Sequence, residues 1–218
     1  MLHGSRPSRR RPRNAATSLL AIAGLALPLF GALGARSESP AADPAPSPAA
    51  EASSDAATRA PIERLYETLL EVMQQAEELG FDGRYAKLEP VVNETYDMEF
   101  MASRVVGRQY QRLAPEEQAL WLKTFGQLTI STYADRFDGF DGERLEIGAV
   151  EESAGDTRIV RTVLHPSDDE PVQLDYRMRN TAAGWRIVDV YLSGTVSELA
   201  LRRSDYSGVL RSDGFEAL

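Results

Sequence analysis

Few side chains in this sequence are of the types that carry catalysis. Cysteine is absent, and the two histidines are His3, near the N-terminus, and His165, which precedes a proline in a turn-like segment. The sequence contains no nucleophile elbow, no phosphate-binding loop and no spaced set of metal ligands. We therefore predict no catalytic residue, no bound metal and no cofactor, and we expect that the protein is not an enzyme.

The acidic residue in the most unusual position is Asp189, which lies in the apolar segment WRIVDVYLS. Burial would raise the pKa of this carboxyl group and suit it to act as a base. In an isomerase of the ketosteroid kind acting on a flat apolar substrate, Tyr133, Tyr176 or Tyr191 would then donate a hydrogen bond to the oxyanion. This enzyme is one alternative function.

A structural role is the other hypothesis for Asp189. A buried carboxylate is stabilised by a hydrogen bond or an ion pair with an arginine. Arg161 and Arg177, on neighbouring predicted strands, are the candidate partners. We favour the structural role because Asp189 has no histidine or cysteine near it in the sequence with which it could form a catalytic group.

The N-terminal segment has the pattern of a secretory signal. Residues 6–13 contain five arginines, and an apolar run follows at Leu19–Leu33. Ala32–Gly34 has small residues at the positions that signal peptidase recognises. We predict a signal peptide over residues 1–35 and export to the periplasm. An uncleaved anchor is the alternative, but about 15 apolar residues are short of the roughly 20 that span a bilayer.

Composition divides the remaining chain in two. Residues 36–60 are rich in Ala, Pro, Ser and acidic side chains, which predicts a flexible tether. Residues 61–218 form one predicted domain, long enough to bury a core. The net charge is −9 even with the N-terminal arginines included. Such an acidic chain argues against binding nucleic acid and against electrostatic attachment to anionic lipid surfaces.

Helical periodicity dominates the first half of the predicted domain. A first helix is expected from Pro61 to a stop at Gly80, and two further helical segments are expected at about 84–96, where Pro90 predicts a kink, and at 97–107. The strongest predicted helix is Ala114–Phe137. Its apolar stripe consists of Leu120, Trp121, Thr124, Phe125, Leu128, Thr132 and Tyr133.

Four strand-like segments follow, at 143–150, 157–165, 171–179 and 185–193. Their short connections predict an antiparallel meander, and a closing helix is expected at about 196–211. Helices followed by strands indicate an α+β fold. The third strand alternates cleanly, and its inward residues are Val172, Leu174, Tyr176 and Met178.

The last predicted strand is apolar on both faces. Strict alternation puts Trp185, Ile187 and Tyr191 on one face with Asp189, and Val188 on the other. Either a helix covers the second face, or the sheet curls around a cavity that an apolar ligand fills. The sequence leaves both possibilities open.

Several long segments of the domain resemble a known family. The domain contains, in order, RYAKLEPVVNETYDMEFMASRVVGRQYQRLAPEEQALWLKTFGQLTISTYADRFDGFDGERLEI and PVQLDYRMRNTAAGWRIVDVYLSGTVSEL. These segments resemble the toluene-tolerance (MlaC) family of exported lipid-binding proteins, over nearly all of residues 61–218. The segments PIERLYETLLEVM, LGFDGRY and GWRIVDVYLSGTVSELALRRSDYS are more similar to its hopanoid-associated branch, HpnM.

The resemblance implies a cystatin-like or nuclear-transport-factor-two-like fold, in which a sheet and a layer of helices enclose an apolar cavity. It implies a monomeric periplasmic carrier that shuttles a hopanoid or a phospholipid between inner- and outer-membrane complexes. A non-binding adaptor of a membrane assembly, its cavity filled by side chains, is a further alternative. The residues expected to line the lipid cavity are Phe100, Met101, Val105, Tyr110, Trp121, Phe125, Leu128, Tyr133, Leu174, Tyr176, Val188 and Val190.

Overall fold

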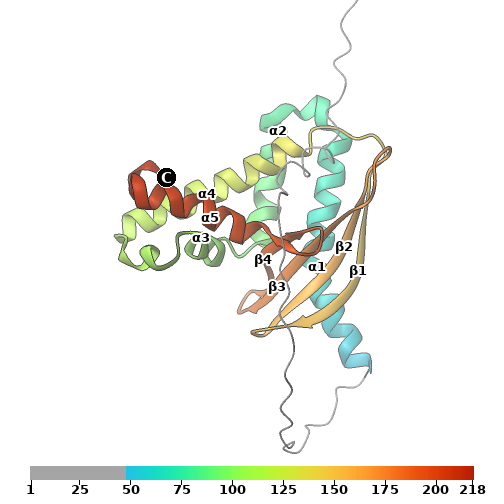
Figure 1. Ribbon diagram of the computed structural model, residues 1–218. Coiled ribbons are helices and arrows are strands. Elements are labelled where there is room, and N and C mark those ends of the chain that lie inside the picture. Colours follow the sequence, from blue (N-terminus) through green and yellow to red (C-terminus); the bar gives the residue numbers. More distant parts are fainter. Residues whose placement is uncertain (1–47) are drawn as a thin grey trace, which may run out of the picture.

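The structure, a computed structural model, describes residues 48–218 and combines helices with one antiparallel sheet (Figure 1). The expected α+β fold is confirmed. The predicted signal peptide and the first part of the predicted tether lie outside the described residues, so both stay predictions. The α-helices are α1 (Pro48–Gln74), α2 (Ala76–Thr95), α3 (Met98–Val106), α4 (Pro115–Arg136) and α5 (Glu198–Ser212), and the short 3₁₀ helices are η1 (Gly107–Arg112) and η2 (Phe215–Ala217).

Helix α1 begins earlier than the sequence pattern indicated. Residues 48–60, expected to belong to a flexible tether, are helical, and Pro61 lies inside the helix instead of starting it. Alanine, which is frequent in this segment, is the best helix former. The segment is also held to the sheet, because Arg158 of β2 donates hydrogen bonds to the hydroxyls of Ser54 and Thr58.

The helical break expected at Gly80 is present as a kink. Gly80 has φ of 59° within α2, a left-handed conformation that favours glycine. Pro90 lies in the same helix, and Gly80 is the only residue of α2 with non-helical dihedrals. The segments on either side of Gly80 therefore take different directions, and the second one leads to α3.

The sheet has five strands in the order β1-β2-β3-β4-β5, one more than expected. Its fifth strand comprises two residues that pair with the end of β4, which is too short to leave a pattern in the sequence. The four longer strands form the predicted meander. The strands are β1 (Arg144–Ser153), β2 (Thr157–His165), β3 (Val172–Thr181), β4 (Gly184–Leu192) and β5 (Val196–Ser197).

Helix α1 covers the inner face of the sheet. Leu65 and Leu69 are buried there, and the ring of Tyr66 meets Tyr176 of β3 edge to face at a centroid distance of 5.8 Å. The Tyr66 hydroxyl group also bonds with that of Thr162 in β2. Each large apolar side chain buried in this layer contributes about 1.5–3 kcal/mol, so the layer contributes strongly to the stability of the domain.

A β-bulge in β4 explains why that strand is apolar on both faces. Met178 of β3 pairs with Ile187 and Arg177 pairs with Asp189, so Val188 is an extra residue without a partner on β3. The bulge reverses the alternation. Ile187 and Val190 therefore both face the core, and the expectation that Ile187 shares a face with Asp189 is wrong.

Helices α3, α4 and α5 form a second group of helices that projects from the sheet beside β4 (Figure 1). Trp121 of α4 is at its centre. The indole Nε1–H donates to the Ala102 carbonyl of α3 at 2.9 Å, and the ring meets Tyr206 of α5 edge to face. This cluster joins the three helices and is continuous with the core under α1.

The apolar stripe of α4 is rotated from the one expected. Trp121 and Phe125 are buried as predicted, but Leu120 and Leu128 are 63% and 46% exposed. Helix α4 contacts α2 as well as α3, so Thr129 and Ile130 occupy the buried positions instead. The prediction that Leu128 faces the sheet is wrong.

The two sides of α4 should respond differently to substitution. Phe125→Ala should lower the free energy of unfolding by about 3–5 kcal/mol, because it empties a fully buried site. Leu128→Trp should change it by no more than about 0.5 kcal/mol, because its side chain is exposed. Urea unfolding followed by circular dichroism measures both, and a large loss in the Leu128 variant would contradict this orientation of α4.

Candidate lipid-binding site

A cavity of about 510 Å³ opens on the outer side of the sheet, where β4 meets α3 and α5. The apolar part of its lining includes Phe100 of α3, Val188 at the bulge and Leu199 of α5. The remaining lining is largely polar and includes four arginines. It consists of Arg104, Gly155, Thr157, Arg177, Arg179, Asp189, Ser197, Ala200 and Arg203.

Asp189 in this cavity anchors the start of α5. Its carboxylate accepts hydrogen bonds from the Ser197 hydroxyl at 2.6 Å, from the Leu199 backbone N–H at 3.1 Å and from the Val190 backbone N–H at 2.9 Å. The Ser197 hydroxyl oxygen in turn accepts from the Ala200 backbone N–H at 2.9 Å, as an N-cap. Burial raises the pKa of Asp189, and its three hydrogen bonds oppose that rise.

The arginine partners proposed for Asp189 are bound elsewhere. Arg161 pairs with Asp175 and Glu151, and Arg177 donates to the hydroxyl of Thr157 and to a backbone carbonyl. Among the described residues Asp189 has no ion pair. The structural role stands, but its form is a helix anchor rather than a cross-strand ion pair.

The turn between β4 and β5 brings the chain back next to Asp189. Gly194 has φ of 71°, and a Cβ built there would lie 3.0 Å from the side-chain oxygen of Gln173. Glycine is therefore needed both for the backbone conformation and for the close approach. The turn places Ser197 opposite Tyr191, within reach of the Asp189 carboxylate.

The side chains do not assemble an isomerase site around Asp189. Tyr176 faces the core under α1, on the opposite face of the sheet from the cavity that Asp189 lines. Tyr133 of α4 bonds through its hydroxyl group to that of Tyr96, and burial, reinforced by the charge of Glu198, raises its pKa. Tyr191 does not line the cavity. No tyrosine among the described residues is therefore placed to donate to an oxyanion there.

A narrow crevice lies on the other side of the start of α5, between α4, α5 and the inner face of the sheet. Its wider part has a volume of about 30 Å³ and its deeper part about 10 Å³. The wider part is lined by Thr132, Tyr133, Arg136, Phe137, Leu174, Tyr176, Val190, Leu192, Glu198 and Arg202. The deeper part is lined by Tyr96, Met101, Thr129, Tyr133, Glu198, Leu199 and Arg202.

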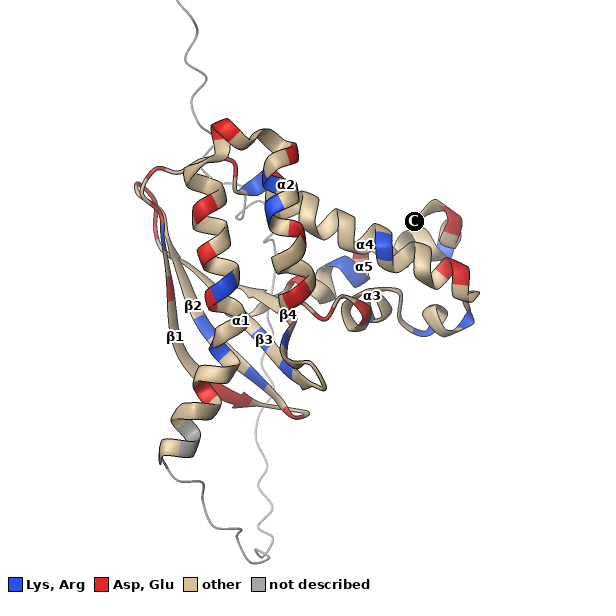
Figure 2. Cartoon of the chain, turned by 180° about the vertical axis from the view of Figure 1, so that it is seen from behind, with Lys and Arg blue, Asp and Glu red and all other residues tan. Residues whose placement is uncertain are grey.

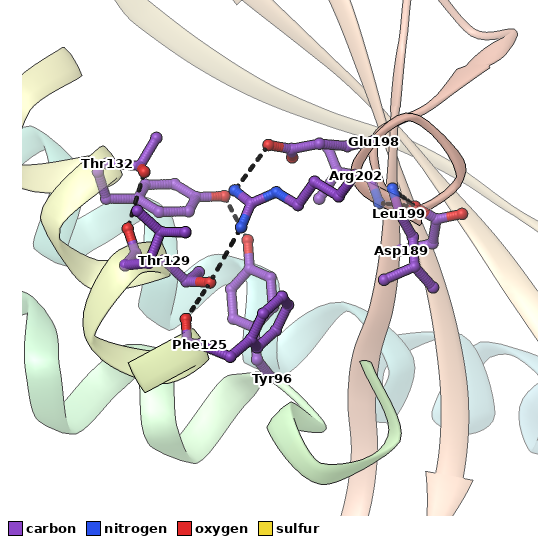
Figure 3. Close-up of polar contacts among 11 residues, drawn as sticks. Tyr96, Phe125, Thr129, Thr132, Asp189, Glu198, Leu199 and Arg202 are labelled. Atoms are coloured by element: carbon purple, nitrogen blue, oxygen red, sulfur yellow. Dashed lines mark hydrogen bonds and ion pairs between the residues drawn. The ribbon is translucent and has the colours of Figure 1, made fainter. Parts of the chain in front are cut away.

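Figure 3 shows the polar contacts around the crevice, where α5 lies beside α4. The Arg202 guanidinium donates to Glu198 at 3.0 Å and to the Thr129 hydroxyl at 3.4 Å, and lies 5.7 Å from the centroid of the Phe125 ring. Tyr96 and Tyr133 bond through their hydroxyl groups. Of these contacts, the Arg202 hydrogen bond to Thr129 and its approach to the Phe125 ring connect α5 with α4, whereas the Glu198 bond lies within α5 and the tyrosine pair connects the end of α2 with α4.

Leu199 lines both the outer cavity and the deeper part of the crevice, so the two spaces are neighbours. They differ in character. The outer cavity is open and basic, whereas the crevice is narrow, with an apolar and aromatic wall on the sheet side. An amphipathic molecule with a polar end and an apolar tail matches this pair.

The residues predicted to line one cavity lie in several places. Met101, Tyr133, Leu174, Tyr176 and Val190 line the crevice. Phe100 and Val188 line the outer cavity. Val105, Trp121 and Phe125 belong to the packed core, Tyr110 packs against that core, and Leu128 is exposed on the opposite side of α4.

Glu198, Arg202 and the arginines of the outer cavity were not predicted from the sequence to line a binding site. The outward positions of Arg177 and Arg179 in the alternating third strand were the only signal for the cavity. Arg104 and Arg203 come from segments far away in the chain, and local periodicity does not show that they meet.

The family model described as MlaC protein matches residues 63–218. The chain belongs to the MlaC family. This confirms the family predicted from the sequence, whereas the HpnM branch stays a prediction. Among the helices within residues 48–218, none is long and apolar enough to cross a membrane.

Two similar proteins extend the comparison. The chain is 26% identical over 134 residues to the intermembrane phospholipid transport system binding protein MlaC of Haemophilus influenzae, a match that covers 59% of this chain and 60% of that relative. The solved structure of a phospholipid-binding protein from Ralstonia solanacearum, in complex with a phospholipid, matches with a TM-score of 0.65 and 19% identity, over 73% of this chain and 91% of that one. At this identity the structural match shows a shared fold.

If Asp189 anchors α5, its hydrogen bonds should contribute more to the free energy of unfolding than its charge does. Asp189→Ala should lower the free energy of unfolding by about 1–3 kcal/mol, because it leaves buried donors without an acceptor. Asp189→Asn keeps one acceptor oxygen and should cost less. Urea unfolding of both variants measures the difference, and equal losses would mean that the negative charge is the essential feature.

Proposed function

We propose that the protein is a periplasmic carrier of phospholipids, whose acyl chains occupy the crevice between α4, α5 and the sheet. The observation that carries the proposal is the apolar inner wall of this crevice, formed by Leu174, Val190 and Leu192 next to an open polar cavity. The names of the two similar proteins, one a phospholipid transport protein and the other a phospholipid-binding protein, support the same substrate class.

The crevice must widen to hold a lipid chain. Its wider part, about 30 Å³, is about the volume of one water molecule, whereas pockets that hold small molecules measure roughly 300–1,000 Å³. The inner wall belongs to the sheet, which α1 holds rigidly. At the crevice, helix α5 is joined to α4 by the hydrogen bond from Arg202 to Thr129 and by the contact of Arg202 with the Phe125 ring, so we propose that these helices separate there when lipid enters.

The energetics of this opening are favourable for exchange. Burial of each methylene contributes about 0.8 kcal/mol relative to water, so a chain of about 15 carbons gains on the order of 10 kcal/mol. The hydrogen bond between Arg202 and Thr129, worth about 1 kcal/mol, opposes this opening. A bilayer offers the chain a similar gain, so transfer between bilayer and protein is nearly balanced. Partner complexes in the inner and outer membranes would then set the direction.

The shape of the crevice favours acyl chains over a hopanoid. A flexible chain can enter a space that widens locally, whereas a rigid fused-ring body needs a wide cavity along its whole length. The HpnM-like segments make a hopanoid the second candidate cargo. Native mass spectrometry and solvent extraction of protein purified from its own host test both. Recovered phospholipid supports the proposal, and a protein that carries no lipid in any preparation supports the adaptor alternative.

Filling the crevice should reduce the lipid load. In Leu192→Trp the added ring should occupy space at the crevice wall and lower the co-purified lipid several-fold, with a loss of stability of about 1–3 kcal/mol at most. Leu128→Trp is the matched control, because it adds the same ring on the exposed side of α4. Quantified lipid extraction and unfolding of the delipidated proteins measure both effects. A Leu192 variant with a full lipid load would place the chains elsewhere.

Weakening the contacts between α4 and α5 should accelerate lipid uptake. Arg202→Met keeps an unbranched stem but removes the hydrogen bonds to Glu198 and Thr129, at a cost of about 1 kcal/mol. Transfer of a fluorescent phospholipid from vesicles, followed by stopped flow, should become several-fold faster. Arg211→Met, near the exposed end of α5, is the control. Uptake that is unchanged or slower in Arg202→Met would refute this route of opening.

A further inference from the structure

We propose that the outer cavity is a phosphate-binding site, formed by Arg104, Arg177, Arg179 and Arg203, that recognises the headgroup of the bound lipid. The assignment to a lipid rests on the proposed carrier function, whereas the phosphate site itself rests on the geometry of the cavity. On this proposal, the phosphate group as well as the acyl chain determines which lipid the protein binds.

The positive charge of the cavity is largely uncompensated. Among the described residues, Arg104, Arg177 and Arg203 form no ion pair, and only Arg179 is paired, with Asp97. The lining contains one carboxylate, Asp189, whose oxygens are occupied by the hydroxyl and N–H groups that start α5. The cavity therefore has four guanidinium groups and no carboxylate with free acceptor oxygens.

This local charge is opposite in sign to that of the whole chain, which is −9. The charged residues of α1 and α2 are mostly acidic. The blue segments of the middle strands of the sheet in Figure 2 are Lys and Arg. Repulsion between arginines makes such a cluster costly in the absence of an anion. An anionic ligand that enters the cavity removes this cost.

The arginines are also held in position. The guanidinium groups of Arg179 and Arg104 lie 4.4 and 4.8 Å from the centroid of the Phe100 ring. Arg177 donates through Nε to the Thr157 hydroxyl at 3.0 Å and through Nη2 to the Ala154 carbonyl at 2.9 Å, which leaves Nη1 for a ligand. The guanidinium of Arg203 packs against Gly107, 3.3 Å from where a Cβ would lie.

A second observation also points to a ligand. The Nε–H of Arg179 is buried and has no hydrogen-bond partner in the described structure. An unsatisfied buried donor costs about 1–3 kcal/mol, more when it is charged. Phosphate oxygens accept two parallel hydrogen bonds from one guanidinium group, which is the geometry that arginine offers and lysine does not.

The position of the cavity fits a lipid phosphate. Leu199 is the common wall between the arginine cavity and the crevice. A phosphate on one side of Leu199 and an acyl chain on the other would belong to a single phospholipid that spans the start of α5. A hopanoid without a phosphate would leave the four arginines without a ligand.

The test uses the delipidated full domain and a double variant, Arg104→Gln with Arg203→Gln. Both side chains are exposed and form no hydrogen bond or ion pair within the described residues, so the variant should fold. The control is Arg112→Gln with Arg144→Gln, the same charge change at exposed positions on η1 and at the start of β1. A second variant, Arg104→Lys with Arg203→Lys, keeps the charge but not the paired donors. Thermal unfolding checks all three.

The probes are dioleoylphosphatidylglycerol and dioleoylglycerol in neutral detergent micelles, which differ in the phosphate-containing headgroup, and inorganic phosphate measured by calorimetry. Capture of the phosphate-bearing lipid should fall about tenfold in the Gln variant and partly in the Lys variant. Capture of dioleoylglycerol, and of both lipids by the control, should not change.

The outcomes separate the possible sources of the phosphate. Weaker binding of inorganic phosphate with unchanged capture of both lipids would support a phosphate site that serves a soluble ester. Unchanged binding of all three probes in the Gln variant would overturn the site. Wild-type protein that captures neither lipid would refute the proposed carrier function, and the phosphate titration would still test the arginine cavity.

Discussion

The architecture of the binding region depends on the extra residue at Val188. Because this bulge reverses the alternation of β4, Asp189 faces outward while Ile187 and Val190 remain in the core. The outward carboxylate accepts the N–H of Leu199 and so fixes where α5 begins. Without the bulge, a carboxylate would face the core, where burial without a charged partner is costly.

The start of α5 then divides the binding region into two environments. Residues on one side of the helix, such as Ala200 and Arg203, line the open basic cavity, and residues on the other side, Glu198 and Arg202, line the narrow crevice. A carrier needs both a water-facing place for a polar end and a dry place for an apolar tail. One anchored helix provides the boundary between them.

The two parts of the domain contribute differently to exchange. The sheet is held by α1 through buried apolar side chains, whereas at the crevice α5 is joined to α4 by one hydrogen bond of Arg202 and its contact with the Phe125 ring. Apolar packing over many contacts is strong, and isolated hydrogen bonds contribute about 1 kcal/mol each. In the proposed carrier, the sheet is the fixed wall, and the part of α5 at the crevice, which few contacts hold to α4, moves to admit an acyl chain.

By itself, the sequence determined the features that depend on local periodicity and composition. It determined the meander, the inward positions of Leu174 and Tyr176 and the acidic character of the chain. Only the tertiary structure decided the rotation of α4 that exposes Leu128, because α4 packs against two helices at once. It also decided the bulge and the arginine cavity, because one inserted residue leaves no periodic signal and Arg104, Arg177 and Arg203 come together only when α3, β3 and α5 pack.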